Sequence, residues 1–417
     1  MNRLHIWSFL ILLAVSVSCF KDPNFESGFS GEDNGGRVFP ERSDSELSRR
    51  VMIMISAGFN TLSNYLSNDL EDLQNGELPV GTSYSSDILM VLSRIVTSSG
   101  QYETPSPAVL YRLYQDFQGN VHRDTLLVWD AETPLSRGET IHEALSYIQN
   151  RFPAKGYGVV FSSHASGWLP EGYFESPSIY EKAPSAGPFR SIGQDKTPEG
   201  SVEMELKEFV EAIPMHLDYL LLDACHSGCV EVAYAFRDIA DVIGFSPAEV
   251  FANGFIYDVI TSHLLGKDPD PVAVCKDYFN FYNRQSGYNR SATITAVLPG
   301  KMDRLVAVCK ELFEKYRTEI RVLNGNYVQG YFRYGRHYFY DFKDILLKAG
   351  INSEEEARLD DALDECVIYK AATPYVLGIP IYIFSGLSMY LPSRGTAFLD
   401  NFYKTQIDWN KATELVK

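Results

Sequence analysis

The sequence predicts an α/β fold, with a mostly parallel sheet flanked by helices and a C-terminal α+β subdomain. From Arg50 onward, apolar runs of strand length alternate with amphipathic stretches of helix length, the pattern of a sheet covered by helices on both faces. The chain has 417 residues, 45% of them hydrophobic, so it can bury a large core. Two of its apolar runs end at a titratable side chain, His164 and Cys225.

Each expected element follows from the spacing of its apolar residues. Apolar runs bounded by turn residues predict strands, at 51–57, 108–116, 124–130, 158–164, 217–224, 242–246, 292–298, 366–372 and 385–392. Apolar residues three and four positions apart predict helices, at 62–73, 138–152, 204–213, 230–241 and 302–317, with a helical or mixed stretch at 85–96. We therefore expect an α/β domain over 49–300 and a subdomain over 301–417 packed on it.

The first 19 residues indicate a signal peptide. Their apolar run, 6–17, is too short to span a bilayer, and small residues precede Cys19. This end is similar to the lipobox of bacterial lipoproteins, in which the cysteine carries acyl chains that anchor the mature chain to a membrane. An ordinary secretory signal with a chance cysteine is the alternative. Residues 20–48, rich in Gly, Ser and charged side chains, predict a flexible linker.

The expected location is the cell envelope, with the protein lipid-anchored to the outer membrane of a Gram-negative bacterium. Lys21 and Asp22 look like the export tags of Bacteroidetes surface lipoproteins. They favour the cell surface, and the periplasmic face stays open as the alternative.

The net charge and the number of cysteines indicate which partners to expect and whether all thiols can pair. The 54 acidic residues outnumber the 37 basic ones, giving a net charge of −17, and no basic stripe is present. Nucleic acid is therefore not an expected partner. Five cysteines remain without Cys19, an odd number that leaves at least one thiol unpaired. Cys275, Cys309 and Cys366 have apolar neighbours and are expected to be buried.

Two strand ends carry the predicted chemistry. Reactive side chains collect beyond the carboxyl ends of parallel strands. A thiol ionises near neutral pH only beside a base or a cation, and an imidazole on the adjacent strand end supplies one. Cys225 and His164 are therefore a candidate nucleophile and base. Two alternatives are less favoured. One is a zinc site in CHSGC (225–229), which lacks a fourth ligand, and the other is a disulfide between Cys225 and Cys229.

These residues resemble a known family. FSSHASGW and YLLLDACHSG resemble the histidine and cysteine blocks of the clostripain family of cysteine peptidases, relatives of caspases, gingipains and legumains. VMIMISAGFN, GFSPAEV, NGFIYD and SGLSMYLP also match, so the resemblance covers roughly residues 50–395. It implies a caspase-like fold in which Cys225 is the nucleophile and His164 the catalytic histidine.

The resemblance also implies an oxyanion hole and a specificity pocket. The backbone N–H groups of Cys225 and Ala165 would stabilise the oxyanion. Many relatives have His-Gly where this chain has His164-Ala165, and a backbone position with positive φ would tolerate Ala poorly. Asp223 matches the base of the S1 pocket, which implies cleavage after Arg or Lys. A capping or turn-stabilising role is the alternative for Asp223.

Further site residues follow from position. Ser246 and Glu249 lie after the next strand, where loops would line the substrate cleft. A cap is the plainer role for Ser246.

Some family members cut themselves between the histidine and cysteine blocks. The long connection 165–200 contains Lys182, Arg190 and Lys196 as candidate processing sites. No loop has the spacing of an EF-hand, and a calcium requirement stays open.

The sequence thus predicts a lipid-anchored cysteine endopeptidase that cleaves peptides and proteins after Arg or Lys without a resident cofactor or metal. The alternative from another class is a noncatalytic surface lipoprotein that keeps the peptidase fold and binds peptide or glycan. The presence of both Cys225 and His164 favours the enzyme.

Overall fold

A computed structural model describes residues 49–81, 87–96, 104–170, 173, 192–197, 200–332 and 338–417. All of them belong to one compact unit, Glu41–Lys417. The predicted signal peptide, the lipidation site Cys19 and the linker 20–48 lie outside the described residues. Within the part of the chain that the structure describes, no helix is both long and apolar enough to cross a membrane.

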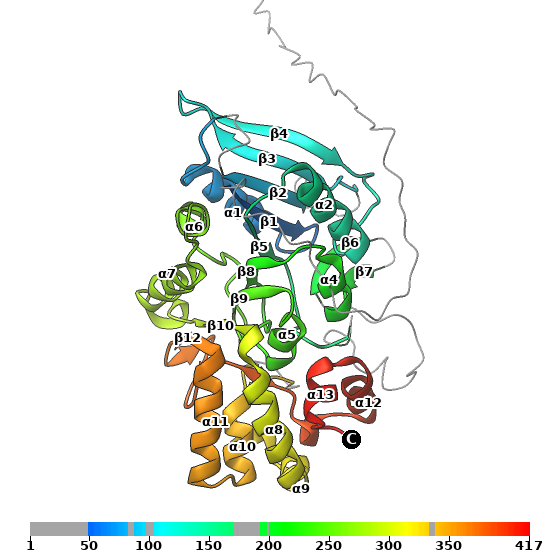
Figure 1. The fold of residues 1–417 in the computed structure, drawn as a ribbon, viewed down its shortest axis with the longest axis vertical. Coiled ribbons are helices and arrows are strands. Elements are labelled where there is room, and N and C mark those ends of the chain that lie inside the picture. Colours follow the sequence, from blue (N-terminus) through cyan, green and yellow to red (C-terminus); the bar gives the residue numbers. More distant parts are fainter. Residues whose placement is uncertain are drawn as a thin grey trace, which may run out of the picture. The chain divides into compact units, whose positions relative to one another are not determined.

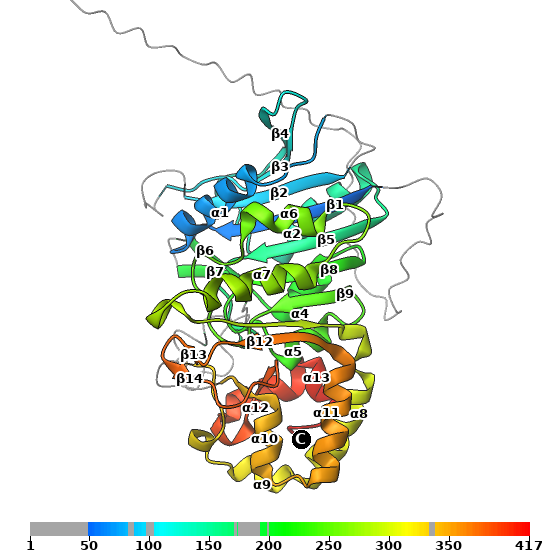
Figure 2. The same cartoon turned by 90° about the vertical axis from the view of Figure 1, so that its left-hand side faces the viewer.

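A mixed, mostly parallel sheet organises the chain, as the alternating pattern predicted. Nine strands of the described chain pair in the order β12-β10-β9-β8-β5-β1-β2-β3-β4 (Figures 1 and 2). The five neighbouring strands in its middle run parallel. They are β1 (Arg50–Gly58), β2 (Ile88–Ile95), β5 (Gly156–Ser162), β8 (Leu217–Asp223) and β9 (Ala240–Phe245).

The outer strands are antiparallel to their neighbours. They are β3 (Val109–Gln115), β4 (Val121–Val128), β10 (Thr293–Val297) and β12 (Val367–Ala372). The edge strand β4 is mostly exposed and carries His, Arg and Asp, side chains that discourage pairing with another sheet. By contrast, all but the first residue of β1 are buried, as expected for a parallel strand covered on both faces.

Helices cover both faces of the sheet. On one face lie α1 (Ser63–Asn75), α6 (Tyr257–Leu264) and α7 (Pro271–Asn283). On the other lie α2 (Gly138–Arg151), α4 (Leu206–Ala212) and α5 (Val230–Ala235) (Figure 1).

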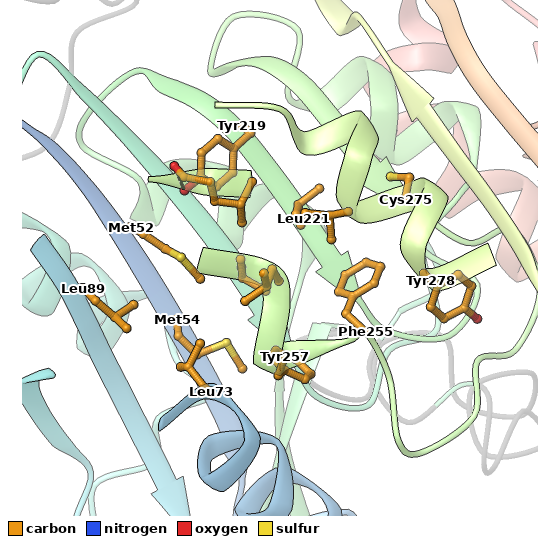
Figure 3. Close-up of a cluster of buried hydrophobic side chains, with 14 of the residues drawn as sticks. Met52, Met54, Leu73, Leu89, Tyr219, Leu221, Phe255, Tyr257, Cys275 and Tyr278 are labelled. Carbon is orange, nitrogen blue, oxygen red and sulfur yellow. Dashed lines mark hydrogen bonds between the residues drawn. The ribbon is translucent and has the colours of Figure 1, made fainter. Parts of the chain in front are cut away.

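The first of these faces holds a large apolar core. Met54 and Leu221 of the sheet belong to one buried cluster with Leu73 of α1 and Tyr278 of α7 (Figure 3). Cys275 belongs to the same cluster and is fully buried, as are Cys309 and Cys366, which confirms the burial predicted for these three thiols. Burial raises the pKa of the Cys275 thiol to about 12, so this side chain is a small hydrophobe rather than a nucleophile.

The C-terminal part adds helices and short strands, and through β12 it also completes the main sheet. Its helices are α8 (Asp303–Lys315), α9 (Arg317–Val322), α10 (Phe342–Ala349), α11 (Ser353–Cys366), α12 (Ala397–Gln406) and α13 (Asp408–Thr413). Its short strands are β11 (Tyr340–Asp341), β13 (Tyr375–Val376), β14 (Ile379–Pro380) and β15 (Ser388–Met389). The domain boundary near residue 300 stays a prediction.

Three local predictions need correction. The stretch 85–96, expected to be helical or mixed, contains strand β2, because its apolar run pairs with β1 deep inside the sheet. The helix expected over 230–241 ends at Ala235, since the chain must turn before β9 begins. The segment 165–200, treated above as one long connection, ends in strand β6 (Ile192–Thr197), which pairs with β7 (Gly200–Met204) directly after it.

Candidate active site

Three residues that pair across β1, β5 and β8 define where the candidate site lies along the strands. Ser56 of β1 pairs with Ser162 of β5, and Ser162 pairs with Asp223 of β8. His164 and Cys225 each follow two residues after one of these three residues. The parallel register therefore brings the predicted base and nucleophile to equivalent positions beyond neighbouring strand ends.

The thiol of Cys225 contacts the loop after β9. The N–H of Val250 donates to its Sγ at 3.5 Å, and Cys225 is half-buried. The next residue, His226, has a left-handed backbone with φ 55°, a conformation that costs a non-glycine residue about 1 kcal/mol or more. The imidazole of His226 stacks on Phe339 at a centroid separation of 4.6 Å. The backbone N–H of His226 donates to the carbonyl of Ala248. The chain thus turns sharply just after Cys225.

Two separate segments hold His164. Its carbonyl accepts a hydrogen bond from the N–H of Gly193 in β6, at 3.0 Å. Its Nε2 lies 2.8 Å from Oγ1 of Thr61, which follows β1. Ala165 forms an isolated bridge with Ile192. Among the described residues, non-glycine positions with positive φ are His226, Leu377 and Glu414, so Ala165 does not need the backbone freedom of glycine.

Asp223, two residues before Cys225 in the sequence, is almost completely buried. Its Oδ2 accepts hydrogen bonds from the hydroxyl of Tyr257 at 2.7 Å and from the N–H of Phe255 at 3.1 Å. Burial raises the pKa of Asp223 to about 6, and these two donors limit the rise. Gly254, with φ +53°, lies against this carboxylate, and a Cβ there would overlap it.

The loop after β9 contains the other predicted pocket residues. The hydroxyl of Ser246 is buried and shares a 2.7 Å hydrogen bond with Thr293, and it also bonds Ala248 within its own loop. These contacts favour the structural role over direct contact with substrate. Glu249 is half-buried and precedes Val250, the residue that contacts the Cys225 sulfur.

The candidate processing sites differ in setting. Lys182 and Arg190 lie outside the described residues. Lys196 lies within β6, where its N–H donates to the carbonyl of Phe59 at 2.8 Å and it pairs with Ser201. A protease needs an extended, accessible backbone, so cleavage at Lys196 would first require this hairpin to open.

The described cysteines, including Cys225 and Cys229, are all free thiols, which argues against the minority disulfide. The described residues contain no group of three or more His, Cys, Asp or Glu side chains that could hold a metal ion.

Sequence reasoning missed two polar residues around the site, Thr61 and Asp69. Thr61 could have been found from its place just after the first parallel strand, where reactive side chains collect. Asp69 lies on the buried face of α1, where its spacing with Leu66 and Leu70 hides a carboxylate among core positions.

Asp69 is a buried acid close to Asp223. It is 4% exposed, and its Oδ2 has no hydrogen-bond partner among the described residues. Burial, reinforced by the negative charges of Asp223 and Asp72, raises the pKa of Asp69 to about 9. Asp69 is therefore protonated at neutral pH. The ionised carboxylate would be buried without a compensating partner and close to two other acids, which is unfavourable.

A thiol and an imidazole beyond adjacent strands of a helix-covered parallel sheet define the class of cysteine peptidases with a caspase-like fold. The chain belongs to the clostripain family, whose model matches residues 55–415. It is a cysteine peptidase of that family. No curated protein matches the sequence.

Solved structures of this family have the same fold. The chain is similar to an inactive zymogen of a C11 protease from Parabacteroides distasonis, with 26% identity, a TM-score of 0.72, and coverage of 90% of this chain and 99% of the other. A secreted C11 cysteine protease from Bacteroides thetaiotaomicron, solved with an irreversible peptide inhibitor, has 23% identity and a TM-score of 0.72, with coverage of 88% and 98%.

The raised pKa of Asp69 predicts that this residue makes folding stability pH-dependent. The folded state keeps a proton up to about pH 9, whereas the unfolded chain releases it near its ordinary value of about 4. Stability is therefore lost as pH rises between these values. Asp69→Asn should have a higher free energy of unfolding than the parent protein, by about 2 to 4 kcal/mol at neutral pH, with the gap widening toward pH 9 and closing toward pH 4.

Thermal unfolding followed by circular dichroism between about pH 4 and pH 9 measures this effect. Both proteins should carry Cys225→Ala to prevent self-cleavage. Glu71→Gln, an exposed position on the same helix whose charge is not among those that raise the pKa of Asp69, is the matched control and should give a constant offset. A gap between Asp69→Asn and its parent that does not change with pH would contradict the assignment.

Proposed function

We propose that this cysteine peptidase is an endopeptidase that cleaves after Arg or Lys, using Cys225 as nucleophile and His164 as general base and acid. The observation that carries the proposal is the shared register of β5 and β8, after which both residues follow at the same interval. No equivalent pairing of a thiol with an imidazole beyond adjacent parallel strands occurs elsewhere among the described residues.

The chemistry requires proton transfer in both directions. The proton of the Cys225 thiol passes to His164, and the thiolate attacks the carbonyl carbon of the scissile peptide bond. The N–H groups of Cys225 and Ala165 would stabilise the resulting oxyanion. His164 then protonates the leaving amine, so the C–N bond breaks and an acyl-enzyme remains. Water, deprotonated by His164, attacks this thioester and releases the carboxylic acid product.

Selectivity for basic residues would come from Asp223. A guanidinium or ammonium entering beside Cys225 would meet a carboxylate in a low-dielectric setting, where ionic hydrogen bonds are strong. The bonds from Tyr257 and Phe255 hold this carboxylate in one orientation. The same bonds also suit a purely structural role, and the two roles differ in their dependence on the substrate.

The test of the function is cleavage of matched reporter peptides that differ only in the residue before the scissile bond. We expect release from Arg and Lys reporters, at least about 100-fold less from Leu and Asp reporters, and none from Cys225→Ala. A covalent arginyl electrophile should label Cys225 in the wild type. If folded, processed protein lacking residues 1–19 neither cleaves nor is labelled, the noncatalytic peptide- or glycan-binding module becomes the better assignment.

The pKa of Asp223 predicts how this selectivity depends on pH. With a folded pKa of about 6, the carboxylate is charged above pH 6 and neutral below it. The ratio of kcat/KM for an arginyl reporter to that for a norleucyl reporter should therefore fall as pH drops through about 6, by roughly 10-fold to 100-fold. Taking the ratio cancels the titration of Cys225 and His164, which both substrates share.

Asp223→Asn should abolish this pH dependence and leave a low ratio at every pH. Asp241→Asn, an exposed carboxylate on the neighbouring strand β9, serves as the control and should behave as the wild type. If Asp223→Asn instead lowers kcat/KM equally for both substrates, Asp223 has the structural role.

We also propose that the enzyme processes itself in the connection 165–200. The setting of Lys196 within a hairpin makes Lys182 and Arg190 the preferred sites. Wild-type protein should give two fragments on a denaturing gel, and Cys225→Ala one intact band. Lys196→Ala should still be cut, whereas Lys182→Ala combined with Arg190→Ala should not. Fragments that persist in Cys225→Ala would mean that another protease made the cut.

Cys19 and the preceding apolar segment support a further proposal, that acyl chains attach the enzyme to the outer membrane. The length of the predicted linker 20–48 would then let the peptidase reach substrates away from the membrane surface.

A further inference from the structure

The side chain of Thr61 contacts the imidazole of His164. Its Oγ1 lies 2.8 Å from Nε2, within hydrogen-bond distance. Thr61 comes from the loop between β1 and α1, and β1 is the sheet neighbour of β5 on the side away from Cys225. The strand before His164, β5, therefore lies between two others. On one side is β1, which precedes the loop with Thr61, and on the other is β8, which precedes Cys225.

The loop that carries Thr61 is fixed by the residue before it. Asn60 is fully buried, and its Nδ2 donates to the carbonyls of Ala57 at 2.9 Å and Gln194 at 2.7 Å. Its Oδ1 accepts from the N–H of Leu62 at 2.8 Å. These bonds tie the loop to β1 and to β6 at once. The Thr61 hydroxyl is thus held from a rigid position, although the residue itself is exposed.

We propose that Thr61 is a positioning residue that fixes the orientation and the tautomer of His164. The inference rests on the proposed function of His164. In the neutral ring, the Nε2–H group donates to Oγ1 of Thr61, which leaves the lone pair on Nδ1. The thiol proton of Cys225 passes to Nδ1, giving a thiolate and an imidazolium, and the same proton later goes from Nδ1 to the leaving amine.

Only this direction of the hydrogen bond serves both stages of the reaction. The imidazolium carries a proton on each nitrogen, so Nε2 must face an acceptor throughout. A Thr61 hydroxyl that donated to Nε2 would place the neutral proton on Nδ1 and remove the base. The acceptor also stabilises the charged ring, which favours the thiolate.

The kinetic test compares Thr61→Val, which removes the hydroxyl at nearly constant volume, with Thr61→Ser, which keeps it. Thr61→Val should lower kcat on the arginyl reporter by roughly 10-fold to 100-fold with KM within about twofold. It should also move the alkaline limb of the kcat/KM profile to lower pH, because the imidazolium loses an acceptor. Thr61→Ser should recover most of the activity. Thr405→Val removes an exposed hydroxyl on α12 and should leave the kinetics unchanged.

A spectroscopic readout is independent of turnover. In protein labelled with nitrogen-15 histidine and carrying Cys225→Ala, the His164 resonances, assigned by their loss in His164→Gln, should show the Nε2–H tautomer. Adding Thr61→Val should give a mixture of tautomers and a lower imidazole pKa. Unchanged tautomer and kcat in Thr61→Val would overturn the proposal. If the parent enzyme cleaves no reporter, the proposed function fails, while the tautomer still decides whether Thr61 orients His164.

Discussion

The parallel register of β1, β5 and β8 is the constraint on which the site depends. A slip by one residue would turn every side chain to the opposite face of the sheet, so the equal spacing after Ser162 and Asp223 is meaningful only while this register holds. Packing enforces it: Gly158 of β5 pairs with Tyr219 of β8, whose ring covers the glycine so closely that a Cβ there would overlap it. The pairing of β5 with β8 thus determines both the packing of the core and the relative positions of His164 and Cys225.

The C-terminal part supports the loop after Cys225. The N–H of Ser388 donates to the carbonyl of Gly228 at 3.0 Å. Nearby, the buried carboxyl of Glu231 accepts hydrogen bonds from the N–H of Tyr390 and the hydroxyl of Tyr403. Burial raises the pKa of Glu231 to about 7. The segment SGLSMYLP is therefore not a separate module, because it holds the backbone that follows Cys225 in place.

The sequence was informative where burial and periodicity agree. The strands that end near His164 and Cys225 were predictable because a parallel strand covered on both faces is apolar at almost every position. The same rule failed for β2, since an unbroken apolar run does not distinguish a strand from a buried helix. The contact of Thr61 with His164 could not be predicted, because it joins residues 103 positions apart through a loop without periodicity. The burial of Asp69 could not be predicted for a related reason. Helix periodicity indicates which residues share one face of a helix, but it does not indicate what packs against that face.

The anchoring of β6 explains how a cut chain could keep an assembled site. Asp195 is fully buried and forms an ion pair with Arg94 at 3.2 Å, and it accepts a hydrogen bond from the N–H of Ser136. Arg94 and Ser136 both lie outside the connection 165–200, so β6 is held independently of the chain that directly precedes it. The bond from Gly193 to the carbonyl of His164 belongs to this same segment. Cleavage before β6 would leave these contacts intact, whereas cleavage at Lys196, inside β6, would sever the strand that carries them.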